Sequence, residues 1–86
     1  GHVDVLTRPR TKSKALQAML EEMAKRVDSQ PLHAAVLHAA APEEAAELRR
    51  AIERRFNCSE LLVTELTPIM GAHTGPGVLG VAFYTE

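Results

Sequence analysis

Two stretches of the chain carry apolar residues along one side of a helix, and short apolar runs precede, separate and follow them. The first stretch covers residues 12–27, with its stripe at Leu16, Met19, Leu20, Met23 and Val27. The second begins at Pro42 and ends at Asn57, with its stripe at Ala45, Leu48, Ile52 and Phe56. Apolar residues that recur every three to four positions predict two amphipathic helices, each of which needs an apolar layer to pack on.

That layer is predicted from four short runs that are typical of strands: Val3–Leu6, Leu32–Ala40, Glu60–Leu66 and Val78–Thr85. Together with the helices they give the order β-α-β-α-β-β. The second run is bounded by Pro31 and by the "APEE" helix start, which favours a buried strand over a helix. The sequence therefore predicts an α/β fold, an α+β two-layer sandwich, in which two helices cover one face of a four-stranded sheet.

Length and composition narrow the possible functions. A chain of 86 residues predicts a single domain over residues 1–86. A net charge of −1 and only three aromatic residues argue against a nucleic-acid surface. The single cysteine, Cys58, excludes an internal disulfide. Because no apolar run is long enough for a membrane span and no signal peptide is present, we expect a cytoplasmic protein.

The glycine-rich loop before the last strand, "GAHTGPG", is the main candidate binding element. Gly71, Gly75 and Gly77 permit unusual backbone angles, and Pro76 stiffens the segment. Backbone amides in such a loop can hold a carboxylate or phosphate, with His73 and Thr74 at its rim. The other interpretation is a structural turn whose histidine is only a hydrogen-bonded neighbour, and glycine spacing alone does not choose between them.

Other polar residues favour ordinary structural roles. His33 and His38 are five positions apart, so strand alternation places them on opposite faces, which disfavours a shared metal site. Cys58 has no neighbouring base and is expected to be a structural thiol. The basic residues from Arg8 to Lys14 either steer an acidic partner or form a solvated helix entry. Since no catalytic arrangement, metal-ligand spacing or cofactor motif appears, we expect no enzyme activity, no metal and no cofactor.

The segment "PIMGAHTGPGVLGVAFY" resembles the end of the DegV family of bacterial fatty-acid-binding proteins. Two further matches follow the family's order: "RTKSKAL" at Arg10–Leu16 and "AVLHAAAPEEAAEL" at Ala35–Leu48. Pro9 departs from the family, which usually has an aliphatic residue there. The family's N-terminal α/β domain is absent from these residues, so we expect a C-terminal domain fragment that exposes apolar surface and self-associates.

The resemblance implies a protein that binds a long-chain fatty acid and presents its carboxylate to a fatty acid kinase. It assigns His73 as the carboxylate contact, Thr74 and Gly75 as residues that shape the loop, and Arg10 as a polar or partner contact. The missing N-terminal domain would complete the site. The alternative is a non-catalytic interaction or regulatory domain of the same fold without lipid. A third hypothesis, an enzyme with His73 as general base, lacks an evident partner group.

Overall fold

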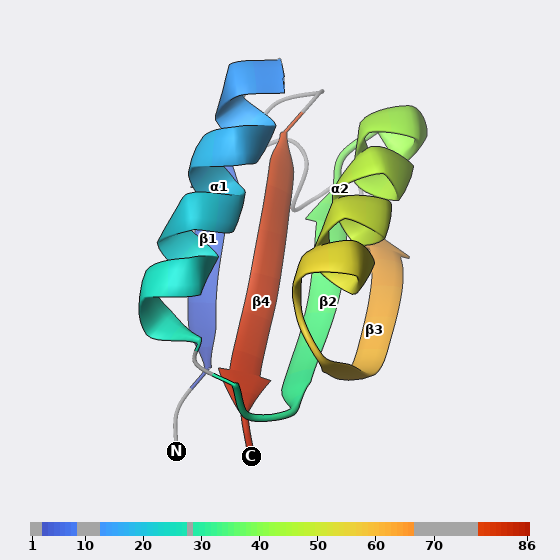
Figure 1. Ribbon diagram of the computed structural model, residues 1–86. Helices are drawn as coiled ribbons and strands as arrows, with labels where there is room; N and C mark the ends of the chain where they lie inside the picture. The colour runs from blue at the N-terminus through green and yellow to red at the C-terminus, as the bar shows by residue number, and fades with distance from the viewer. Residues whose placement is uncertain (1–2, 9–12, 28, 67–77) are drawn as a thin grey trace.

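The computed structural model describes residues 3–8, 13–27, 29–66 and 78–86 (Figure 1). Its elements are β1 (Asp4–Arg8), α1 (Ser13–Arg26), β2 (Leu32–His38), α2 (Pro42–Arg55), β3 (Cys58–Glu65) and β4 (Leu79–Thr85). The predicted order of strands and helices is confirmed. The boundaries differ by at most two residues, as in β2, which ends before Ala39 and Ala40 because the chain turns there.

The four strands form one mixed sheet in the order β1-β4-β2-β3. The last strand, β4, lies in the interior and runs antiparallel to both β1 and β2. Strands β2 and β3 are parallel, and α2 is the helix that connects them. Because β4 pairs with both β1 and β2, these two strands belong to one sheet only when the last strand lies between them.

Both helices lie on the same face of this sheet, as Figure 1 shows, with α1 toward the β1 side and α2 toward the β3 side. The alternation in β2 confirms this arrangement: Leu32, Ala34, Val36 and His38 are buried, and the residues between them are only partly so. The predicted two-layer fold with helices on one face is therefore correct.

The core fills the space between the helices and the sheet. The predicted helical stripes supply Met19, Met23, Leu48 and Ile52, all fully buried, while Leu16 and Phe56 are partly buried at its edge. The strands supply further fully buried side chains: Leu32, Val36, Leu79, Val81 and Phe83. Burial of each large apolar side chain contributes about 1.5–3 kcal/mol, so this layer is the main source of stability.

The start of α2 shows why the chain turns so sharply after β2. The backbone N–H of Ala41 donates to Nδ1 of the buried His38 at 3.1 Å, which satisfies an amide at the helix entry. Pro42 follows as the first helical residue, and Glu43 and Glu44 stand in the first turn, as predicted. Ala40 completes the turn with a φ of 53°, a left-handed conformation that disfavours any residue with a Cβ atom.

Substitution of Ala40 tests this turn. Ala40→Gly removes the Cβ clash and is expected to raise the free energy of unfolding by about 1 kcal/mol. The control is Ala46→Gly inside α2, which should lower it by about 1 kcal/mol because glycine is a poor helix former. Urea denaturation measures both values. Equal destabilisation by the two substitutions would contradict the strained turn.

Candidate functional site

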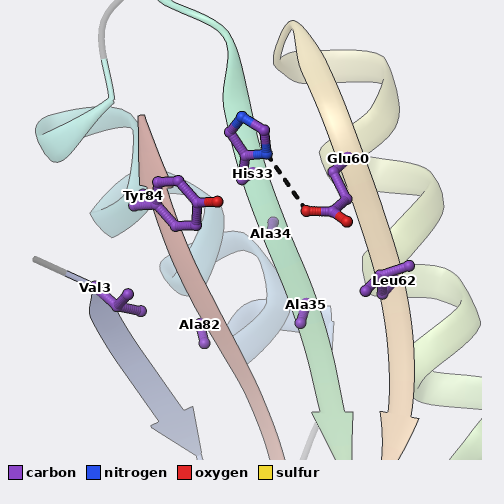
Figure 2. A pocket seen from close by; sticks show the side chains of 8 residues that line it. All are labelled: Val3, His33, Ala34, Ala35, Glu60, Leu62, Ala82 and Tyr84. Carbon is purple, nitrogen blue, oxygen red and sulfur yellow. Dashed lines mark hydrogen bonds and ion pairs between the residues drawn. The ribbon is translucent and has the colours of Figure 1, made fainter. Parts of the chain in front are cut away.

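The second face of the sheet carries apolar side chains that no element of the described chain covers. Val3, Val5, Leu62 and Tyr84 all lie on it with 43–56% of their surface exposed. In Figure 2 this face is seen from outside, with the helices behind the sheet. The solvent-exposed face of an antiparallel sheet usually carries polar residues. An exposed apolar patch usually marks a binding surface. We therefore call this surface, built on these four residues with Ala35 and Ala82, the open face.

A shallow hollow of about 150 Å³ lies at the centre of the open face. It exists because Ala35 of β2 and Ala82 of β4 are paired across the sheet and both have short side chains. It is lined by Val3, His33, Ala34, Ala35, Glu60, Leu62, Ala82 and Tyr84 (Figure 2). The small residues of β2 and β4 thus serve both faces: Ala34 is buried on the helix side, and Ala35 and Ala82 leave the hollow on the other.

One end of the open face carries a polar cluster centred on His33. Its Nε2 lies 2.7 Å from Oε2 of Glu86, and its Nδ1 lies 3.4 Å from Oε1 of Glu60. The ring of Tyr84 stacks on the imidazole with a centroid distance of 4.7 Å and an interplanar angle of 4°. The hydrogen bond that His33 makes to Glu86 raises the pKa of its imidazole, desolvation opposes this, and Glu60 adds a further increase. In its protonated form, His33 lies between two carboxylates that it can pair with.

Sequence reasoning placed His33 correctly on the face opposite His38 but missed its partners. Glu60 and Glu86 lie 27 and 53 residues away along the chain. Only the pairing of His33 with Glu60 across β2 and β3, and with Tyr84 across β2 and β4, brings these groups together. No local spacing in the sequence signals such a cluster.

The predicted carboxylate contacts lie outside the described residues: His73, Thr74 and Gly75, the loop residues Gly71, Pro76 and Gly77, and Arg10. The described residues that flank these segments are held in the sheet by hydrogen bonds and strand pairing. Leu66 N–H donates to the His38 carbonyl at 2.7 Å, and Ala39 N–H donates to the Val78 carbonyl at 3.1 Å. Arg8 at the end of β1 is opposite Leu79 at the start of β4. Both segments therefore attach at one end of the sheet, and the His33 cluster occupies the other.

Cys58 begins β3 at the edge of the core. Its Sγ lies 3.8 Å from the carbonyl of Ile52. Burial raises the pKa of this thiol, Glu53 raises it further, and Arg49 partly opposes the change. A thiol held protonated at neutral pH fits the expected structural role. Among the residues that the structure describes, no group of three or more His, Cys, Asp and Glu side chains is placed to hold a metal ion.

A second groove, of about 350 Å³, runs between the two helices. It is lined by Leu16, Gln17, Leu20, Glu47, Arg50, Ala51 and Arg54. Glu47, Arg50 and Arg54 are exposed on the solvent side of α2, so this groove has the character of an ordinary gap between two amphipathic helices. Within the described helices, none is long and apolar enough to cross a membrane. The open face is the better candidate site because no element in the described part of the chain covers its exposed apolar residues.

The His33 cluster predicts a pH-dependent stability. Because the folded-state pKa of His33 lies above its ordinary value of about 6.5, protonation favours the folded chain. The stabilisation is complete below about pH 6.5 and is lost as the pH rises through the folded-state pKa. The free energy of unfolding of the native chain, relative to that of His33→Gln, should therefore be larger at pH 5.5 than at pH 8.5.

Urea denaturation at both pH values measures this difference, and NMR titration of the His33 ring gives its pKa directly. As a control for the partner, Glu86→Gln should move that pKa back toward about 6.5, since the hydrogen bond to Glu86 is the largest cause of the shift. A stability difference between the native chain and His33→Gln that does not change with pH would refute the assigned ion pairs.

Comparison with known proteins is consistent with this fold. A DegV domain-containing protein of Streptomyces coelicolor is 40% identical over 82 residues, which are 94% of this chain and 29% of the relative. The crystal structure of a DegV family protein from Corynebacterium glutamicum matches with a TM-score of 0.81 and 26% identity, over 90% of this chain and 30% of that one. A Thermotoga maritima structure described as revealing fatty acid binding function matches with a TM-score of 0.78 and 19% identity, over 85% and 27%.

The chain thus spans less than a third of the length of the relatives that it matches. The family model described as "Uncharacterised protein, DegV family" matches residues 1–86, all of the sequence. The resemblance noted at the HTGPG loop is therefore confirmed over the whole chain, and this protein belongs to the DegV family.

Proposed function

We propose that this chain is the lipid-binding part of a DegV-type carrier and that the open face is the floor on which the acyl chain of a long-chain fatty acid lies. One observation carries the proposal: an exposed apolar sheet face with a hollow over Ala35 and Ala82, opposite the face that the two described helices cover. The family membership and the Thermotoga maritima structure described as revealing fatty acid binding function support it.

The hollow suits an alkyl chain better than a polar ligand. Its apolar lining comes from Val3, Leu62, the ring of Tyr84 and the alanines of β2 and β4, and its polar lining, His33 and Glu60, belongs to the cluster at one end. Contact with such a surface removes apolar area from water, which is worth about 25 cal/mol for each Å². An extended chain that follows β2 and β4 would gain this contact along the length of the strands.

The charges on the open face determine the direction of the fatty acid. Glu60 and Glu86 repel a carboxylate from the end that holds His33, although protonated His33 reduces this repulsion. The carboxylate is therefore directed toward the opposite end, where residues 9–12 and 67–77 attach. The resemblance assigns His73 as its contact in that region, with Thr74 and Gly75 shaping the loop and Arg10 as a further polar or partner contact.

The finer parts of the proposal rest on the resemblance to the family. A buried carboxylate needs several hydrogen-bond donors to offset the cost of its desolvation, and His73 alone is too few. The rest of the longer DegV chain would supply the remaining donors. The complete carrier would then present the carboxylate to a fatty acid kinase, with the carrier itself acting as a binding protein and not as a catalyst.

A second candidate function is an interaction or regulatory domain of the same fold without lipid. The small size of the hollow favours it, since about 150 Å³ is less than the 300–1,000 Å³ of typical small-molecule pockets. Native mass spectrometry of the purified full-length protein, with the N-terminal domain that completes the site, separates the two functions. A co-purifying acyl species supports the lipid carrier, and a protein free of lipid supports the interaction domain.

Two adjacent residues of β3 provide a matched test of the acyl floor. Leu62 and Val63 are both exposed apolar residues, at 52% and 43%, but strand alternation places them on opposite faces. Leu62→Glu puts a charge on the open face and should weaken palmitate binding at least tenfold, whereas Val63→Glu should change it less than twofold. Fluorescence displacement measures both. Equal losses would mean that the lipid does not lie on the open face.

The role of His73 requires a separate test. His73→Ala should weaken fatty acid binding by about tenfold, because a charge-assisted hydrogen bond to a carboxylate contributes about 1.5–3 kcal/mol. It should also reduce phosphorylation of the bound lipid when a fatty acid kinase is added. Glu47→Ala, on the exposed side of α2 and away from the open face, serves as the control. Unchanged affinity and unchanged phosphorylation in His73→Ala would remove this residue from the site.

A further inference from the structure

His38 is a buried polar side chain that the proposed site does not use. Only 6% of its surface is exposed, and among the described residues no other polar or charged side chain is buried. A buried polar group needs hydrogen bonds to offset its desolvation, and an apolar residue at this position would avoid that cost. The contribution of the imidazole is therefore expected to lie in its hydrogen bonds.

The hydrogen bond of this ring closes a strained turn. Nδ1 accepts from the backbone N–H of Ala41 at 3.1 Å, so Nδ1 carries no proton and the neutral ring holds its proton on Nε2. The turn covers residues 38–41, and within it Ala40 has a φ of 53°. Because a residue with a Cβ atom disfavours the left-handed conformation, the contact to Nδ1 stabilises a backbone shape that the chain would otherwise avoid.

The same turn holds the ends of two neighbouring strands. The His38 carbonyl accepts from Leu66 N–H at 2.7 Å, just after β3. Ala39 N–H donates to the Val78 carbonyl at 3.1 Å, just before β4. Since Leu66 and Val78 flank residues 67–77, both ends of that segment are hydrogen-bonded to one turn of the backbone.

We propose that His38 is a positioning residue for fatty acid binding: the contact of its Nδ1 with Ala41 N–H fixes the turn that aligns both ends of the segment carrying His73. The proposal rests on the proposed function, in which His73 contacts the carboxylate. The imidazole acts through the backbone and does not touch the ligand itself. Loss of the Nδ1 acceptor frees the turn to leave its left-handed conformation, and the hydrogen bonds to Leu66 and Val78 then weaken.

Two substitutions separate the Nδ1 acceptor from the rest of the ring. His38→Asn places its amide oxygen near the position of Nδ1 and keeps an acceptor for Ala41 N–H. His38→Gln places its amide near the position of Nε2 and loses that contact. In the full-length protein, His38→Gln should weaken palmitate binding by about fivefold or more and His38→Asn by less than about twofold, measured by fluorescence displacement.

A core substitution serves as the control for lower stability. Ile52 is fully buried near the other end of α2, so Ile52→Val destabilises the fold without altering the turn at His38. It should change palmitate binding by less than about twofold. An affinity loss in Ile52→Val as large as that in His38→Gln would mean that stability, and not the turn, controls binding.

A structural measurement in this chain needs no lipid. NMR hydrogen exchange compares the amides of Ala39 and Leu66, at the turn, with the amide of Val36 in the middle of β2. Relative to Val36, the amides of Ala39 and Leu66 should exchange about tenfold or more faster in His38→Gln than in the unmodified chain. In His38→Asn this ratio should stay within about twofold of the unmodified chain.

The two measurements distinguish failure of the positioning role from failure of the proposed function. If the unmodified full-length protein does not bind palmitate, the proposed function fails and the positioning role fails with it. Equal affinities of His38→Gln and His38→Asn for palmitate, whether reduced or unchanged, would overturn the positioning role and leave the proposed function standing. Exchange at Ala39 and Leu66 that changes in parallel with exchange at Val36 would also overturn it, because His38 would then contribute only to global stability.

Discussion

The structure depends on how one four-stranded sheet divides its apolar residues between two faces. Met19, Met23, Leu48 and Ile52 can be buried only against the strands, and this contact holds both helices on one side. β4 is central to the division because its alternate residues face the helix-covered core and the open face. Burial of the core therefore leaves an apolar face that meets no helix among the described elements.

The described contacts differ between the two ends of that face. At one end His33 joins Glu60 and Glu86, and the ring of Tyr84 stacks on it. At the other end, β2 holds the residues that flank the HTGPG segment, through hydrogen bonds at His38 and Ala39. Under the proposed function, the two carboxylates at the His33 end would direct the carboxylate of a fatty acid toward the opposite end of the strands.

The sequence predicted what depends on local periodicity. The stripe of α1, the start of α2 at Pro42, and the opposite faces of His33 and His38 follow from spacings of three to five residues. It could not predict that β4 lies between β1 and β2, because strand order depends on pairing energies between distant segments. The His33 cluster and the pairing of Ala35 with Ala82 are consequences of that order. The predicted contacts around His73 lie outside the described residues, so that part remains a prediction.

The most direct measurement of the central claim is where an acyl chain touches this domain. Methyl-labelled protein mixed with unlabelled palmitate would show NMR contacts between the acyl protons and specific side chains. The structure predicts contacts to the methyl groups of Val5 and Leu62 on the open face and none to those of Leu48 and Ile52. Contacts to Leu48 or Ile52, between the helices and the sheet, would contradict the account.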